Sequence, residues 1–185
     1  MIIEETLIPG AYLIKPKVFE DERGYFLESY NEKLFKEKTG LKVNFVQDNQ
    51  SLSQYGVLRG LHFQYGPYAQ AKLVQVIQGK VLDVIVDIRK ESSTYGKHFS
   101  IVLDSQSKTQ LFAPRGVAHG FVTLENDTIF FYKCDNFYNK ENEGGLLYSD
   151  PELSIDWGLK PEELIISEKD KINPSLNALK TSLSL

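Results

Sequence analysis

The sequence predicts an all-β fold of the jelly-roll class with short peripheral helices, and three observations support this. Extended runs rich in β-branched and aromatic residues alternate with a period of two. Turns that contain Gly, Pro or Asn separate these runs at short intervals. No regular alternation of strand and helix appears, which argues against a doubly wound fold. We therefore expect an antiparallel sandwich or jelly roll formed by a single domain over residues 1–185.

The expected strands are distributed over most of the chain. A first extended segment, 12–19, contains Pro16 and is therefore expected at a sheet edge. A polar stretch, 47–49, ends a further run that begins at Val43, and it fits either turn chemistry or a ligand-binding rim. The other expected strands are 25–30, 57–64, 70–78, 81–89, 97–104, 111–113, 117–123, 128–134 and a short edge strand at 153–157.

The stretch from Val57 to Arg89 carries the strongest pattern. In its last run the two faces of a strand separate cleanly, and Gly79-Lys80 before it fits a tight antiparallel hairpin. Arg59, His62 and Lys72 stand among apolar neighbours in this stretch, so we expect them to face one cavity. The two faces are Leu82, Val84, Val86 and Ile88 on one side, and Val81, Asp83, Ile85, Asp87 and Arg89 on the other.

Helices are expected only at the periphery. Asn31 is a good N-cap for a helix over 32–39, and Gly40 is a good residue to end it. Pro161 opens a helical turn over 161–164. The spacing from Ser167 to Asp170 resembles a capping box, with Asp as a weaker partner than Glu.

Composition restricts the class of protein. The formal net charge is -4 and the pI is near 5.5, which disfavours nucleic-acid partners. Cys134 is the only cysteine, so we expect a reducing compartment. The N-terminal residues do not resemble a signal peptide, and no apolar segment has the length of a membrane span. We therefore expect a cytoplasmic protein with no membrane or nucleic-acid partner.

The three histidines do not have the spacing of a metal site. Gln64 stands two residues after His62, where a metal-binding jelly roll usually offers a second histidine, and His98 and His119 are distant in sequence. Taken alone, His119 is expected to be a buried, hydrogen-bonded residue.

Acid–base chemistry is the alternative that the residues favour. An inward-facing His62 beside Arg59 is a potential base, oriented by Asp83, Asp87 or Asp170, and the spacing does not choose among them. Tyr132 is a possible proton donor, and Lys72 a possible stabiliser of negative charge on an oxygen. A ligand-binding β-protein without catalysis remains the alternative at this point.

Several motifs together resemble the dTDP-4-dehydrorhamnose 3,5-epimerase family of the cupin superfamily. They occur in the family's order from about the first strand to Asp170: 21–28, 46–49, 57–64, 72–74, 83–89, 118–121, 132–133 and 167–170. The resemblance implies a cupin barrel, also called a double-stranded β-helix. It also implies epimerisation without a cofactor at C3 and C5 of dTDP-4-dehydro-6-deoxy-D-glucose, in dTDP-L-rhamnose biosynthesis.

The resemblance also implies roles for individual residues. His62, paired with Asp170, is the expected base, Lys72 steadies an enolate oxygen, and Tyr132 returns a proton from the other face. A homodimer that exchanges an N-terminal strand is implied, so that Arg23 and Glu28 serve the neighbouring subunit. Tyr138 is expected to stack on the thymine. The full set of implied substrate-binding residues is Arg23, Glu28, Gln47, Asp48, Asn49, Arg59, His119, Tyr138, Glu143 and Lys169.

Three positions depart from the family pattern. Arg115 and Val117 stand where an acidic residue and an aromatic residue are commoner, and Tyr148 stands where Trp is common. None of these replaces an expected catalytic group. The alternatives within the scaffold are a C3-only epimerase or a ketoisomerase acting on a related dTDP-4-keto-6-deoxyhexose. A metal-dependent cupin and a sugar-binding module are the alternatives from other classes.

Overall fold

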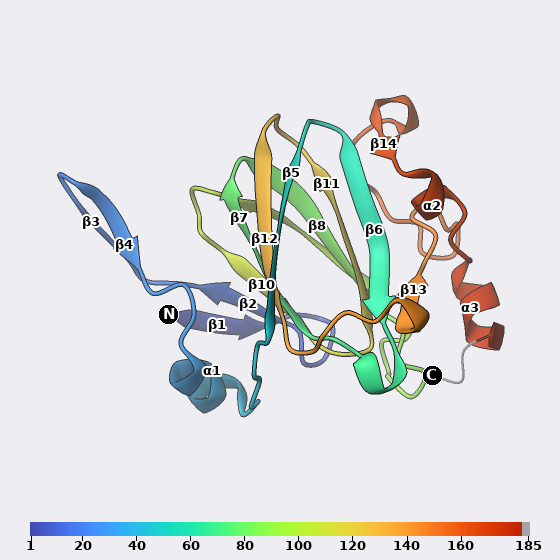
Figure 1. Ribbon diagram of the computed structural model, residues 1–185, viewed down its shortest axis with the longest axis horizontal. Helices are drawn as coiled ribbons and strands as arrows, with labels where there is room; N and C mark the ends of the chain where they lie inside the picture. The colour runs from blue at the N-terminus through green and yellow to red at the C-terminus, as the bar shows by residue number, and fades with distance from the viewer. Residues whose placement is uncertain (183–185) are drawn as a thin grey trace.

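Two six-stranded sheets, which we call the first and second sheet, form the body of the protein (Figure 1). The computed structural model describes residues 1–182, so the last three residues of the expected domain lie outside it. The first sheet has the order β1 (Ile2–Glu5), β2 (Tyr12–Lys15), β10 (Gln110–Ala113), β7 (Lys72–Gln78), β12 (Thr128–Cys134) and β5 (Gln47–Ser53). The second has the order β13 (Glu143–Gly145), β6 (Val57–Gln64), β11 (Val117–Thr123), β8 (Lys80–Asp87) and β9 (His98–Asp104).

The remaining elements lie around these sheets. β3 (Val18–Asp21) and β4 (Gly24–Leu27) pair only with each other and project from the body as a hairpin (Figure 1). β14 (Ile165–Ile166) is the sixth strand of the second sheet and pairs in parallel with β6. The helices are α1 (Glu32–Thr39), α2 (Glu168–Lys171) and α3 (Leu176–Ser182), with 3-10 turns at Gly66–Tyr68, Lys140–Asn142 and Pro161–Glu163.

Apolar side chains from both sheets meet in the space between them. Val74 and Phe130 come from the first sheet, whereas Ile85 and Phe121 come from the second, and all four are buried in one cluster. This arrangement confirms the predicted all-β jelly-roll class. The opposite face of the second sheet is covered by the C-terminal segment, where Trp157 packs with β6 and β8 residues. Most residues on both faces of β8 are therefore buried.

The predicted hairpin at Gly79-Lys80 is wrong. β7 pairs with β10 and β12, whereas β8 pairs with β9 and β11, so the chain crosses from the first sheet to the second at Gly79. Gly79 has a positive φ of 83° at this corner. A Gly-containing turn between two β-runs fits a corner that switches sheets as well as a hairpin, and only the pairing of distant strands distinguishes them.

The predictions for the helices are confirmed more closely than those for the edge strands. The Asn31 side chain accepts a hydrogen bond from the Leu34 N–H at 3.0 Å, and Gly40 ends α1 in the left-handed region. The first extended segment is divided into β2 and β3, and residues 153–157 form no strand. Trp157 in that segment instead donates its Nε1 hydrogen to the Tyr148 carbonyl at 3.0 Å. None of the helices within residues 1–182 is long and apolar enough to cross a membrane.

A close contact between two glycines fixes how β6 and β11 pair. A Cβ atom on Gly60 would lie 2.6 Å from the Cα atom of Gly120, and one on Gly120 would lie 2.9 Å from the Arg59 carbonyl oxygen. The register between the two strands shifts between His119 and Phe121, at this contact, and His62 is paired with His119. The glycines therefore allow the approach that places two histidines side by side.

We expect Gly60→Ala to lower the free energy of unfolding much more than Gly24→Ala. Both residues have nearly the same positive φ, 123° and 122°, but a Cβ on Gly24 meets nothing within 4 Å. Gly24→Ala should therefore cost about 1–2 kcal/mol from backbone strain alone. Gly60→Ala adds a backbone clash of about 1–3 kcal/mol. Urea unfolding of the two variants checks this, and equal losses would contradict it.

Candidate active site

A cavity of about 650 Å³ lies between the two sheets at their open edge. Its wall contains Arg59, His62 and Lys72, so the prediction that these three share one cavity is confirmed. They come from facing sheets, however, because β6 belongs to the second sheet and β7 to the first. A second cavity of about 320 Å³ adjoins it and shares Asn49, His62, Lys72 and Tyr132 with it. Together their volume suits a ligand larger than a single sugar.

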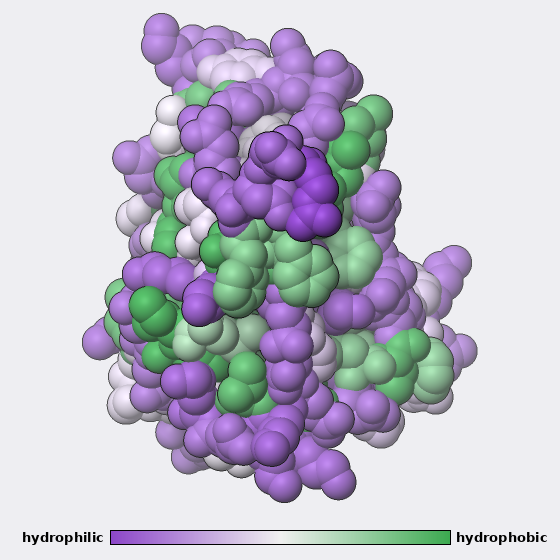
Figure 2. Space-filling view, turned by 90° about the vertical axis from the view of Figure 1, so that its left-hand side faces the viewer, coloured by the Kyte–Doolittle hydropathy of each residue, from purple (hydrophilic) through white to green (hydrophobic). Residues whose placement is uncertain are grey.

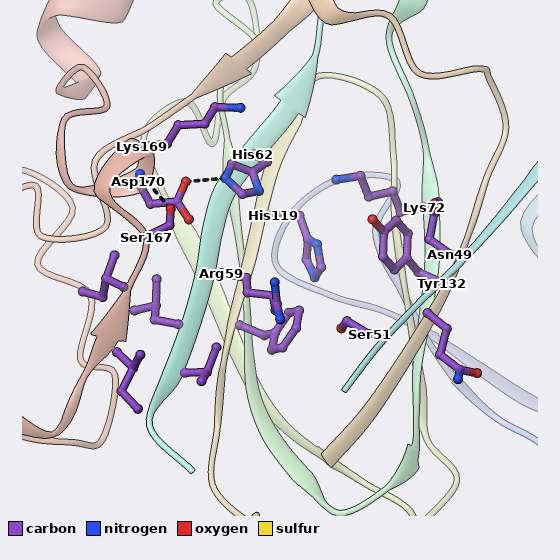
Figure 3. A pocket seen from close by; sticks show the side chains of 16 residues that line it. Asn49, Ser51, Arg59, His62, Lys72, His119, Tyr132, Ser167, Lys169 and Asp170 are labelled. Carbon is purple, nitrogen blue, oxygen red and sulfur yellow. Dashed lines mark hydrogen bonds and ion pairs between the residues drawn. The ribbon is translucent and has the colours of Figure 1, made fainter. Parts of the chain in front are cut away.

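His62 and Asp170 form a close pair in the wall of this cavity (Figure 3). The His62 Nε2 atom lies 2.6 Å from Asp170 Oδ1, and the Gly60 N–H donates to Asp170 Oδ2 at 3.4 Å. Burial raises the pKa of Asp170, but the His62 hydrogen bond and charge outweigh it and the net pKa is lowered. Of the three carboxylates that the sequence left open, Asp170 is therefore the one that orients His62.

A short helix delivers Asp170 to this position. Ser167 caps α2, and its side chain accepts a hydrogen bond from the Asp170 N–H at 3.1 Å. The preceding strand, β14, is paired with the start of β6. The Ser167–Asp170 spacing seen in the sequence thus forms a real N-cap that fixes Asp170 beside the strand carrying His62.

Tyr132 and Lys72 face His62 from the first sheet (Figure 3). The Lys72 Nζ atom lies 5.7 Å from the centroid of the Tyr132 ring. Burial raises the pKa of Tyr132, so its phenol keeps its proton and can donate it. Burial also lowers the pKa of Lys72, and electrostatic interactions with Cys134, Asp83 and Glu143 oppose that shift. Neither side chain hydrogen-bonds to a described residue, so both remain available to a ligand.

His119 forms a second imidazole–carboxylate pair deeper in the cavity. Its Nε2 atom lies 2.9 Å from Asp83 Oδ2, and its ring stacks near Phe130 with centroids 6.0 Å apart. His119 is 6% exposed and Asp83 is fully buried. The expectation of a buried, hydrogen-bonded His119 is confirmed, and Asp83 is its partner rather than the partner of His62.

The rim of the cavity carries a connected set of polar residues. The Glu143 Oε2 atom accepts from Lys169 Nζ at 2.6 Å and from the Tyr138 hydroxyl at 3.2 Å. Burial would raise the pKa of Glu143, but Lys169 lowers it overall. Gln47 donates to Asn49 Oδ1 at 3.1 Å and accepts from the Tyr138 N–H at 3.1 Å. These contacts bring five of the expected binding residues together at one mouth.

Three of the expected binding residues do not reach the cavity within one chain. Asp48 points to the outer face of the first sheet, where Lys133 binds it at 2.9 Å, because alternation along β5 turns only its neighbours Gln47 and Asn49 inward. Arg23 lies at the tip of the projecting hairpin beside Asp21, with an 84% exposed side chain. Glu28 accepts a hydrogen bond from Asn31 at 3.0 Å.

Sequence reasoning missed several residues of the cavity wall. Cys134 lies in the smaller cavity, and its sulfur accepts a hydrogen bond from Asn49 at 3.7 Å. Ser51 and Phe121 line the larger one. Cys134 follows Tyr132 by two residues, and Ser51 follows Asn49 by two, so the period of a strand already places each pair on one face.

Such an interior serves acid–base chemistry. One group can take a proton, a phenol on the facing sheet can return one, and a cation can stabilise the negative charge formed between them. Within residues 1–182 no group of three or more His, Cys, Asp or Glu side chains is arranged to hold a metal ion. The fold and the site together define an enzyme of the jelly-roll class that transfers protons.

Comparison with known proteins identifies the family. The model of the dTDP-4-dehydrorhamnose 3,5-epimerase family matches residues 5–178. The dTDP-4-dehydrorhamnose 3,5-epimerase of Shigella flexneri is 50% identical over 170 residues, which is 92% of this chain and 93% of that protein. The chain belongs to the dTDP-4-dehydrorhamnose 3,5-epimerase family, which confirms the resemblance drawn from the motifs.

Solved structures agree with this assignment. The crystal structure of dTDP-4-dehydrorhamnose 3,5-epimerase from Elizabethkingia anophelis superposes with a TM-score of 0.93 at 54% identity, covering 96% of this chain and 97% of that one. The dTDP-6-deoxy-D-glucose-3,5-epimerase of Legionella pneumophila, crystallised with dTDP-4-keto-L-rhamnose, gives 0.91 at 45% identity, covering 95% and 93%. The cupin-like jelly roll is therefore shared with these enzymes.

We expect Asp170→Asn to destabilise the protein at neutral pH and to lose this effect in acid. Because the pKa of Asp170 is lowered in the folded state, its contribution is present above the unfolded value near 3.8 and is lost as pH falls through the folded pKa. The loss at pH 7 should be about 1.5 kcal/mol, the scale of a charged hydrogen bond. Urea unfolding at pH 7 and pH 3 checks this, with the exposed Asp156→Asn as the control variant. A loss that is equal at both pH values would contradict it.

Proposed function

We propose that this enzyme inverts C3 and C5 of dTDP-4-dehydro-6-deoxy-D-glucose to give dTDP-4-dehydro-L-rhamnose, a step of dTDP-L-rhamnose biosynthesis. Membership of the family supports the reaction, and the ligand of the Legionella relative supports the substrate class. The observation that carries the mechanism is the placement of His62, paired with Asp170, opposite the free phenol of Tyr132. We propose that residues 1–185 form a single domain that carries His62, Lys72, Tyr132 and Asp170.

The chemistry follows from the C4 ketone of the substrate. The ketone acidifies the C–H bonds at C3 and C5, so a base of moderate strength can remove either proton. His62 takes the proton, and Asp170 stabilises the imidazolium that forms. Lys72 donates a hydrogen bond to the enolate oxygen, where negative charge develops. Tyr132 returns a proton to the opposite face of the planar intermediate, so the configuration at the carbon is inverted.

The remaining cavity residues hold the nucleotide sugar in this proposal. Arg59 lies at the mouth with its Nε atom bound to Ser53 at 3.1 Å, which leaves the rest of the guanidinium for the diphosphate. Tyr138 is 53% exposed and offers a ring for stacking on the thymine. Asp48 is left out, because its side chain is on the outer face. The other residues proposed to bind the substrate are Gln47, Asn49, His119, Glu143 and Lys169.

We further propose a homodimer in which the β3–β4 hairpin of one subunit completes the site of the other. Phe19 and Phe26 on this hairpin are 52% and 70% exposed, and a two-stranded hairpin alone is only marginally stable in water. Figure 2 shows this side of the molecule, where hydrophobic residues (green) gather next to strongly hydrophilic ones (dark purple). A second subunit that covers these rings also receives Arg23 and Glu28. A cytoplasmic location remains a prediction from composition.

Product formed in D₂O tests the reaction. We expect deuterium at both C3 and C5 of the product by NMR, because each carbon gives up a proton and receives another from groups that exchange with solvent. Label at C3 alone would identify a C3-only epimerase and contradict the proposal. His62→Ala should abolish incorporation at both carbons, with a loss of about 10³-fold or more in kcat. Tyr132→Phe should impair product formation more than exchange at C3.

Mixing two inactive variants tests the shared site. A dimer of Arg23→Ala with His62→Ala contains one site with both residues intact, so refolding the mixture should restore about a quarter of the wild-type activity. The matched control mixes Tyr132→Phe with His62→Ala. Both of those residues belong to the same subunit's cavity, so this pair should not complement. No recovery in the first mixture, with dimers present, would show that Arg23 does not serve the neighbouring subunit.

A further inference from the structure

Asp83 is a buried carboxylate that the proposed reaction does not yet use. It lies on β8 and is 0% exposed, among apolar residues that include Val81, Ile85 and Phe121. A carboxylate in such surroundings is costly unless it is paired. Its Oδ2 atom accepts a hydrogen bond from His119, and its Oδ1 atom is buried without a hydrogen-bond partner in the described part of the chain. A buried carboxylate oxygen without a hydrogen-bond partner is uncommon in folded proteins and calls for an explanation.

The contact with His119 fixes the orientation of that ring. Because Nε2 faces the carboxylate at 2.9 Å, it must carry a hydrogen to donate. The other nitrogen, Nδ1, is therefore the one that remains for the cavity, where His119 lies between the two facing sheets (Figure 3). The stacked rings of Phe130 and Phe121, with centroids 4.0 Å apart, support the imidazole from the side. Without Asp83, neither the orientation of the His119 ring nor the nitrogen that carries its hydrogen would be fixed by this contact.

The charge of Asp83 also acts across the cavity. The Lys72 side chain hydrogen-bonds to no described residue. Burial lowers the pKa of its ammonium group, and the interaction with Asp83 is among those that raise this pKa. Within residues 1–182, no lysine or arginine side chain forms an ion pair with Asp83, whose partner is His119. The other ionisable groups that line the two cavities are Arg59, His62, His119, Tyr132, Cys134, Tyr138, Glu143, Lys169 and Asp170.

We propose that Asp83 is a positioning residue of the reaction, which fixes the His119 ring and supplies the buried negative charge that keeps Lys72 an ammonium. This inference rests on the proposed function, because it assigns Asp83 a task at the site of the enolate. Asp83 itself touches no substrate. It acts through His119 by a hydrogen bond and on Lys72 by charge.

Two substitutions separate these effects. Asp83→Asn keeps the shape and a hydrogen-bond acceptor for His119 but removes the charge, whereas Asp83→Leu removes both. With the charge removed, the pKa of Lys72 falls further, so the alkaline limb of the pH profile of kcat/KM moves to lower pH, by about half a unit to one unit. At pH values above the limb we expect kcat/KM of Asp83→Asn to be about three- to tenfold lower. Asp83→Leu should show the same shift and, in addition, a raised KM.

The controls distinguish a positioning role from a structural one. Asp87→Asn alters another fully buried aspartate on the same face of β8, which is bound by Arg89, Ser92 and Thr94 away from the cavity. It should lower the melting temperature without moving the alkaline limb. The affinity for dTDP, which lacks the hexose, should stay within about twofold in Asp83→Asn. If the alkaline limb of Asp83→Asn is not moved and its kcat/KM is within twofold of wild type, the proposal is overturned.

A measurement on the wild-type enzyme covers the case in which the variants fail to fold. In ¹⁵N NMR of protein with labelled histidines, the His119 signals are identified as those missing from the spectrum of the His119→Gln variant. The proposal expects a proton on Nε2 of His119 in the ligand-free enzyme, and a ring protonated on Nδ1 alone overturns it. Neither result depends on turnover. If the wild-type enzyme incorporates no deuterium into the product, the proposed function is refuted instead. Failure of the proposed function and failure of the role of Asp83 are therefore distinguishable.

Discussion

The structure depends on one constraint, which is that ionisable groups must be held between two apolar sheets at low dielectric. A buried charge without a partner costs several kcal/mol, and two of the carboxylates here avoid that cost by pairing with imidazoles. Lys72 is different, because no described residue hydrogen-bonds to its ammonium. A desolvated cation that lacks a partner binds negative charge on a ligand strongly, and the enolate of the proposed reaction provides that charge.

The crossing between β6 and β7, over residues 65–71, makes this arrangement possible. Because the chain changes sheets there, β6 and β7 lie opposite each other although they are almost consecutive, and His62 faces Lys72 and Tyr132 across the interior. A hairpin would have placed the base and the ammonium side by side on one surface. Inversion at a carbon needs groups on both faces of a planar intermediate, so two facing sheets suit this chemistry better than a single one.

The sequence predicted local features well and long-range pairing poorly. The period of two placed Lys72, Tyr132 and His62 correctly, and applied more strictly to β5 it would also have excluded Asp48 and found Ser51. The cap at Asn31 is likewise a local signal. The carboxylate that orients His62 lies 108 residues away, and the one bound to His119 lies 36 residues away, so neither choice follows from spacing. The resemblance to a family supplied Asp170, and only the folded chain assigned Asp83.

The same reasoning links the projecting hairpin to catalysis. Within one chain the cavity opens between the edge of the first sheet and the strands β6 and β14, and none of the hairpin residues lines it. Water at that opening would screen the field of Lys72 and Asp83, because a polar solvent weakens every charge interaction in the site. In the proposed dimer the partner's hairpin brings aromatic rings and Arg23 to this opening. Assembly would then exclude water and supply a diphosphate ligand in one step, so the residues that look least stable in the isolated chain are those that the neighbouring site requires.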